Sequence, residues 1–345
     1  MKVCHSRQLS VWVAVMLFAG MMNLADVVAA SAADGAQLIS LEPRTNFFGG
    51  REERLRFTVA AAEPVIGRVD WLFAAGERTI ARGEIELKVA ADRSTEFALP
   101  LRCPPVREGV VFRTKLIVTV VGEGMESPLA TLEQPIWLFP DDALADRQHW
   151  LNELDIALYD PVGATDALFR EISIPHKWLP HLSALEQLRH GLLVIGEGVS
   201  PDDKLAPLVL EKAAAGVAVL WLSPGDGDLP LAQSQIKAAR IDWRRSDVIA
   251  ALDKRLDSAF WSPDGIVAQR SLTLVANGDA VVARVSDEQA AWPWLEIKYS
   301  SPRASLIVCG FRIVDAWPHS PTPRFLLVRM LEELQSKVMS EKSTK

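Results

Sequence analysis

The feature that most constrains this chain is a change in its hydrophobic period part-way along. From about Ala36 to Pro140, polar and apolar residues alternate one by one, as they do in Arg54–Val59. This is the pattern of strands that bury one face. From Asp155 onwards, short apolar runs alternate with segments of helical period. The sequence therefore predicts two domains of different structural class.

The first domain, residues 36–140, is expected to be an antiparallel, Ig-like β-sandwich. Its alternating or β-branched runs recur at short spacing and are separated by glycine-containing turns, with no helical period between them. The acidic pair Asp141–Asp142 is expected to be the linker that follows. The predicted strands include Arg54–Val59, Gly83–Val89, Thr95–Leu99, Val110–Val121 and Pro135–Pro140.

The second domain, residues 150–336, is expected to be an α/β domain with a doubly wound, mostly parallel sheet. Apolar strands separated by helices are typical of a parallel sheet that is covered on both faces. The final helix is predicted at Pro323–Gln335, and residues 337–345 are expected to form a frayed, disordered tail. The predicted strands include Ile156–Tyr159, Leu192–Ile195, Val217–Leu222, Leu295–Tyr299 and Ser305–Phe311, with a hairpin formed by Ser271–Ala276 and Ala280–Val285.

Residues 1–32 have the pattern of a secretory signal peptide. Lys2 and Arg7 precede the uncharged and mostly apolar run Leu9–Ala25, and Ala30-Ser31-Ala32 supplies the small residues of a cleavage site. The alternative is an uncleaved membrane anchor, which needs about 20 apolar residues, and this run is shorter. We therefore expect an exported protein, periplasmic or extracellular, that has no membrane contact after cleavage.

Composition excludes several function classes. The chain has 37 Lys and Arg against 44 Asp and Glu, and it has no basic cluster, so a nucleic-acid partner is excluded. It has no CxxC, no HExxH and no other paired ligand spacing, so the sequence predicts neither a metal nor a cofactor. Cys103 and Cys309 fall in different predicted domains, and we expect both to be buried apolar groups and not a disulfide.

The stretch His190–Gly198, followed by Asp202–Asp203, an apolar helix and Ala215–Leu220, resembles class I glutamine amidotransferase-like domains. It is similar in particular to the degenerate versions attached to exported glycoside hydrolases, including the trimerisation domain of β-galactosidases. Ser305–Arg312 and the helix after it resemble the last strand and helix of that group. The resemblance covers roughly residues 155–335 and implies a flavodoxin-like fold.

The catalytic groups of that family are missing here. Its active members place a cysteine on a sharp strand-to-helix turn, and a histidine and a glutamate reach it from a later strand. The corresponding turn, Leu222–Gly225, has no cysteine, and Pro224 removes a backbone N–H that would bind the oxyanion. The later strand, Phe311–Val314, lacks the His/Glu pair. The resemblance thus implies a scaffold without its catalytic triad, and it favours a non-catalytic role.

Two other sets of residues are weaker catalytic candidates. Ser223 has His319 as its candidate base, although an ordinary turn and a solvated loop residue are the favoured interpretation. Asp160 and Glu197 end two strands, at the sheet edge where doubly wound folds bind ligands. They are candidate ligand contacts or paired carboxylates for glycoside cleavage. Capping of the next helix is the alternative role for such acids.

Tryptophan is unusually frequent, with 11 residues against two tyrosines. Indole rings on loops or strand ends suggest stacking against sugars, although packing is the favoured interpretation because tryptophan buries a large area. Trp71, Trp137 and Trp221 lie in predicted strands and are expected in the core. The loop or strand-end group is Trp243, Trp261, Trp292, Trp294 and Trp317, of which Trp261 and Trp317 are candidate ligand contacts.

These observations predict an exported, non-catalytic accessory or interaction protein. Its partner is expected to be another protein or a polysaccharide, and the link to polysaccharide handling comes only from the resemblance. Two alternatives remain. One is a hydrolase, esterase-like or glycosidase-like, that uses Ser223 or the edge formed by Asp160 and Glu197. The other is a scaffold that associates with itself.

Overall fold

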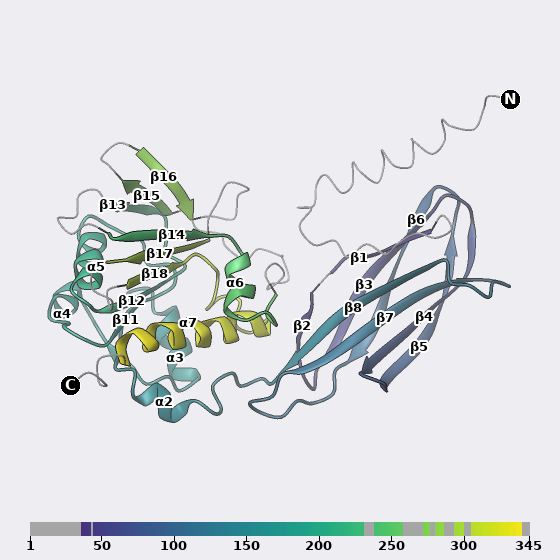
Figure 1. Cartoon of the computed structure of the whole chain (residues 1–345), viewed down its shortest axis with the longest axis horizontal. Helices are drawn as coiled ribbons and strands as arrows, with labels where there is room; N and C mark the ends of the chain where they lie inside the picture. The colour runs from purple at the N-terminus through teal and green to yellow at the C-terminus, as the bar shows by residue number, and fades with distance from the viewer. Residues whose placement is uncertain are drawn as a thin grey trace. The chain divides into compact units, whose positions relative to one another are not determined.

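A computed structural model of the chain describes residues 36–42, 44–230, 238–257, 272–276, 280–285, 293–299 and 305–339. The chain divides into two compact units, unit 1 from Met1 to Pro140 and unit 2 from Asp141 to Lys345 (Figure 1). The expected signal segment lies outside the described residues. Within the described part of the chain, no helix is long and apolar enough to cross a bilayer.

Unit 1 consists of two sheets around one core. One sheet has the strand order β1-β3-β6 and the other β2-β8-β7-β4-β5. Alternate residues of β3, namely Leu55, Phe57 and Val59, point into a core that they share with residues of the second sheet such as Val69 and Val118. The strands are β1 Ala36–Ser40, β2 Asn46–Phe48, β3 Glu52–Ala61, β4 Val65–Ala75, β5 Arg78–Val89, β6 Arg93–Arg102, β7 Phe112–Gly122 and β8 Ala130–Phe139.

Two tryptophans of unit 1 are less buried than the sequence predicts. Trp71 is half-buried at the margin of the core, where its indole lies directly over Gly83 of the neighbouring strand. Trp137 is also half-buried and carries the guanidinium of Arg113 at 5.4 Å from its ring centroid. The prediction that both belong to the core was therefore wrong. Being in a strand does not say which face of the sheet is covered, or by how much.

Unit 2 is built on a larger, mixed sheet with the strand order β10-β9-β11-β12-β18-β17-β14. Neighbouring strands from β10 to β18 are parallel, and β17 and β14 are added antiparallel at one side. A small sheet, β13-β15-β16, completes the unit. The strands are β9 Ile156–Tyr159, β10 Lys177–Trp178, β11 Leu192–Ile195, β12 Ala218–Leu222, β13 Gly227–Pro230, β14 Arg240–Arg244, β15 Leu272–Ala276, β16 Ala280–Val285, β17 Trp294–Lys298 and β18 Ser305–Cys309.

Helices cover the central strands of this sheet. Every residue of β11 and β12 is buried. Val209 and Leu210 of α5 pack with Val219 and Trp221 on one face, and α7 lies along β12 (Figure 1). This explains why these strands read as unbroken apolar runs. The helices are α2 Gln148–Asn152, α3 Ala164–Glu171, α4 Leu182–Glu186, α5 Leu205–Ala214, α6 Asp247–Leu252 and α7 Pro321–Met339.

The expectation of an all-β part followed by a part with a parallel sheet is confirmed. The predicted hairpin is present as β15 and β16, with its turn residue Asn277 outside the described residues. Helix α2 and the strands β10, β13 and β14 were not predicted. Most of them are short, and short elements depend on tertiary packing more than on local pattern.

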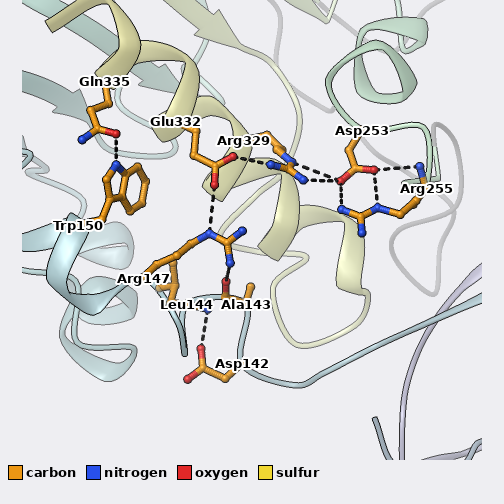
Figure 2. Close-up of polar contacts among 10 residues, drawn as sticks. All are labelled: Asp142, Ala143, Leu144, Arg147, Trp150, Asp253, Arg255, Arg329, Glu332 and Gln335. Carbon is orange, nitrogen blue, oxygen red and sulfur yellow. Dashed lines mark hydrogen bonds and ion pairs between the residues drawn. The ribbon is translucent and has the colours of Figure 1, made fainter. Parts of the chain in front are cut away.

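Charged side chains of alternating sign connect α7 to the segment that follows α6 (Figure 2). Arg329 of α7 donates to Glu332 at 2.6 Å and to Asp253, which follows α6, at 3.0 and 3.2 Å. Arg255 donates to the same Asp253 at 2.5 and 2.8 Å. Burial by itself raises the pKa of Asp253, but the hydrogen bonds from Arg255 and Arg329 outweigh it and lower the pKa from 3.8 to about 2.

This shift predicts how acid destabilises unit 2. The folded-state pKa of Asp253, about 2, lies below the ordinary value of 3.8, so the ionised carboxylate contributes stability above pH 3.8 that is lost as the pH falls toward 2. The contribution is roughly 2 kcal/mol of unfolding free energy. We expect Asp253→Asn to be less stable at neutral pH and to lose less stability between pH 4 and 2, roughly the range of this titration. Urea unfolding at neutral pH and between pH 4 and 2 measures both effects, and equal acid sensitivity of the two proteins would contradict the assignment.

Candidate functional site

The carboxyl ends of the parallel strands bring together the residues that the sequence singles out. Asp160 follows β9, Glu197 is the second residue after β11, and Ser223 follows β12 directly. The segment 310–320 follows β18 and closes the same edge of the sheet. This is the edge where ligands bind in doubly wound folds, so it is the candidate site.

Asp160 is committed to the chain's own backbone. Its side chain is buried, with the residue only 2% exposed. Oδ1 accepts a hydrogen bond from the N–H of Gly163 at 3.0 Å, and Oδ2 accepts from the N–H groups of Thr165 and Asp166 at 2.8 and 2.9 Å. These amides belong to the turn before α3 and to its first residues, where a helix has no carbonyl partners for them. The arrangement is that of a helix cap.

Glu197 links the segment after β11 to the segments that follow β9 and β18. Its carboxylate accepts hydrogen bonds from the N–H of Val314 at 2.7 Å and of Asp315 at 3.3 Å, both in the segment after β18. Its own N–H donates to Oγ1 of the fully buried Thr165 at 2.8 Å. The turns after β9, β11 and β18 are thereby joined in one network. Both carboxylates accept hydrogen bonds from backbone amides.

Ser223 keeps an unusual backbone conformation. Its φ is +28°, which is uncommon for a residue with a side chain, and the residue is 1% exposed. Its N–H donates to the carbonyl of Cys309 at 2.6 Å, and its carbonyl accepts from the N–H of Gly198 at 2.8 Å. These two bonds hold the turn in place. The chain then continues into β13, so the helix that follows a nucleophile in a hydrolase turn is replaced by a strand.

His319 does not complete a dyad with Ser223. It is exposed, and its backbone N–H donates to the carbonyl of Ala316 at 3.1 Å. Of the hydrogen bonds formed by described residues, none joins Ser223 to His319. A serine nucleophile needs a base within hydrogen-bond reach, and the hydrogen bonds of the described residues do not link His319 to Ser223 in that role.

The environment of the two cysteines disfavours their reactive thiolate form. Both are free and buried, as expected for small apolar groups. Burial raises the pKa of Cys103 to about 12 and raises the pKa of Cys309 further above its usual value. Because the thiolate is the reactive form, neither side chain is a nucleophile at physiological pH.

Packing accounts for most of the tryptophans near the sheet. Trp317 is 8% exposed, and the guanidinium of Arg324 lies 5.5 Å from its ring centroid. Trp294 is buried in β17, and Trp243 packs against the core of the main sheet from β14. Trp261 and Trp292 lie outside the described residues.

One aromatic residue that the sequence reasoning missed is exposed. Trp178 is 50% accessible on the outermost strand, β10. Its only sequence signal is its position between Pro175 and Pro180, which predicts an irregular segment. In the described ranges, His, Cys, Asp and Glu form no group of three or more that is suited to a metal ion.

Removing the Asp160 carboxylate distinguishes a cap from a functional acid. We expect Asp160→Ala to lower the unfolding free energy by roughly 1–2 kcal/mol, because amides at the start of α3 lose their acceptor. Thermal unfolding followed by circular dichroism measures this change. Asp203→Ala, which removes an exposed acid that follows the neighbouring strand, is the control and should change stability little. An Asp160→Ala protein as stable as the control would argue against capping.

Comparison with known proteins identifies no relative. No protein-family model matches the chain, and no curated protein matches it either. Solved structures align only weakly. Spo0M, a sporulation control protein from Bacillus subtilis, is 11% identical with a TM-score of 0.27, covering 35% of this chain and 55% of Spo0M, so the chain spans about half of that protein. A putative beta-galactosidase from Bacteroides fragilis is 8% identical with a TM-score of 0.22, covering 57% of this chain and 38% of that one. These scores are too low to support a common fold.

Proposed function

We propose that the chain is an exported, non-catalytic interaction protein, whose second unit is a degenerate class I amidotransferase-like domain with flavodoxin-like topology. One observation carries the functional part of this proposal. Asp160 and Glu197, the candidate acids of the carboxyl edge, bind the chain's own backbone amides. Ser223 is buried, and among the described residues no hydrogen bond joins it to His319, its candidate base.

Strand order supports the proposed topology. Numbered along the chain, the parallel strands β10-β9-β11-β12-β18 have the order 2-1-3-4-5, which is the flavodoxin-like order. The left-handed backbone at Ser223 lies directly after β12, where the resemblance expects a nucleophile. In unit 1, the two sheets around one core support the proposed Ig-like sandwich.

Reactive probes and substrate panels test the absence of catalysis. We expect the mature protein to resist labelling by a fluorophosphonate and to leave ester and glycoside substrates unhydrolysed, because His319 forms no described hydrogen bond with Ser223 and both carboxylates bind backbone amides. Ser223→Ala and Glu197→Gln are the matched variants. Labelling or turnover that disappears in either variant would replace this proposal with a hydrolase.

For the partner we propose a polysaccharide, on the basis of the resemblance and of the one exposed indole in the sheet, Trp178. Rings stack on sugars only when a face is accessible, which excludes Trp294 and Trp317 as described. We expect Trp178→Ala to weaken retention on insoluble polysaccharide roughly tenfold, the effect of losing about 1.4 kcal/mol. Tyr159→Phe is a control that keeps a ring at the neighbouring strand.

Pull-down on a set of polysaccharides, read together with light scattering after size exclusion, separates the outcomes. Retention that is equal in the parent protein and in Trp178→Ala would remove this residue from the proposal. Absence of retention combined with a stable oligomer would favour the self-associating scaffold.

A further inference from the structure

Residues 141–154, here called the strap, join the last strand of unit 1 to the first strand of unit 2. The sequence predicts a linker at its start, yet most of the strap is packed. Its apolar side chains Ala143, Leu144, Leu151 and Leu154 are buried. A free linker exposes such residues, so the strap is a docked element of unit 2.

Polar contacts fix the strap to α7 (Figure 2). Arg147 donates through Nε to Glu332 of α7 at 3.1 Å, and its Nη1 donates to the carbonyl of Ala143 within the strap at 3.3 Å. The indole N–H of Trp150 donates to Oε1 of Gln335. At the start of the strap, Nη1 of Arg324 donates to the carbonyl of Asp141 at 2.6 Å.

Hydrogen-bonded charges on α7 and after α6 position the Glu332 carboxylate for its bond with Arg147. Its other oxygen accepts from Arg329 at 2.6 Å, and Arg329 is oriented by the buried Asp253. The order of charge is therefore Arg147, Glu332, Arg329, Asp253 and Arg255, alternating in sign. A carboxylate positioned in this way loses little entropy when it binds the strap.

Docking shortens the free connection between the units. Strand β8 ends at Phe139, and Arg324 already binds the carbonyl of Asp141, so only Pro140, which is itself buried, lies between these two attached points. If the strap detached, the free chain would extend to Asp155. At about 3.3–3.6 Å per residue, its greatest reach would grow from roughly 10 Å to roughly 50 Å.

We propose that the strap is a releasable element that sets the reach between the two units, and that it opens as one piece before the sheet does. The strap forms no strand, and its one helix, α2, has five residues. Elements with such limited pairing open at lower free energy than central strands. The Arg147–Glu332 pair has about a third of each side chain exposed (27% and 32%), so salt weakens it. A longer connection lowers the effective concentration of one unit at a ligand held by the other.

Amide hydrogen exchange of the full mature chain, read by mass spectrometry at low and high salt, tests this. In the parent protein, we expect amides of 143–154 to exchange more slowly than a free chain but faster than those of β11 and β12. Glu332→Gln and Leu151→Ala should each speed exchange in the strap roughly tenfold, with β11 and β12 unchanged. Salt should speed it in the parent protein but little in Glu332→Gln. Glu171→Gln, at an exposed position in α3, is the control and should match the parent protein.

Three results would overturn the proposal. One is a strap that exchanges at free-chain rates in the parent protein, which would make it a linker. Another is exchange in both variants that equals the Glu171→Gln control. The third is opening of the strap and of β12 at the same rate in every protein, which would make the strap part of the sheet's own folding unit.

Discussion

The structure of unit 2 depends on carboxylates that accept hydrogen bonds from backbone amides at one edge of the sheet. Wherever a parallel strand turns into a helix, several N–H groups lose their partners. Asp160 accepts three of them, and Glu197 accepts two more from a segment far along the chain. A charged acceptor forms stronger hydrogen bonds than a neutral one, so two side chains hold three turns in place.

The same bonds limit what this edge does chemically. Backbone amides use three of the roughly four acceptor sites of the Asp160 carboxylate and two of those of Glu197, which leaves fewer sites for exchanging a proton with a ligand. Ser223, directly after β12, shows how backbone bonds hold an unusual turn. Its left-handed backbone is strained, and such strain persists only where neighbouring contacts impose it, here the bonds to Cys309 and Gly198. These two bonds account for the conformation of the turn at Ser223.

Hydrophobic period predicted the two classes of sheet and the terminal helix, because burial of whole faces repeats regularly along the chain. The position of Asp160 at the end of a strand also suggested capping as one of its roles, because the acceptor and the helix that it caps are neighbours in sequence. Hydrophobic period gave no sign that Glu197 would bind Val314, more than a hundred residues away. It also placed Trp71 in the core, whereas a three-stranded sheet opposite a five-stranded one leaves the margin of the core partly open.

The two polar networks of unit 2 differ in a way that matters for its behaviour. At the sheet edge, Asp160 is buried and its partners are backbone amides, so ions in solution have little influence on it. On α7, one of the strap's contacts, that of Arg147 with Glu332, is an ion pair between two partly exposed side chains, and solvent screens it. Burial therefore separates a part of unit 2 that salt hardly affects from a part that salt loosens. Because the loosened part carries the connection to unit 1, a change in ionic conditions acts on the connection and leaves the sheet intact.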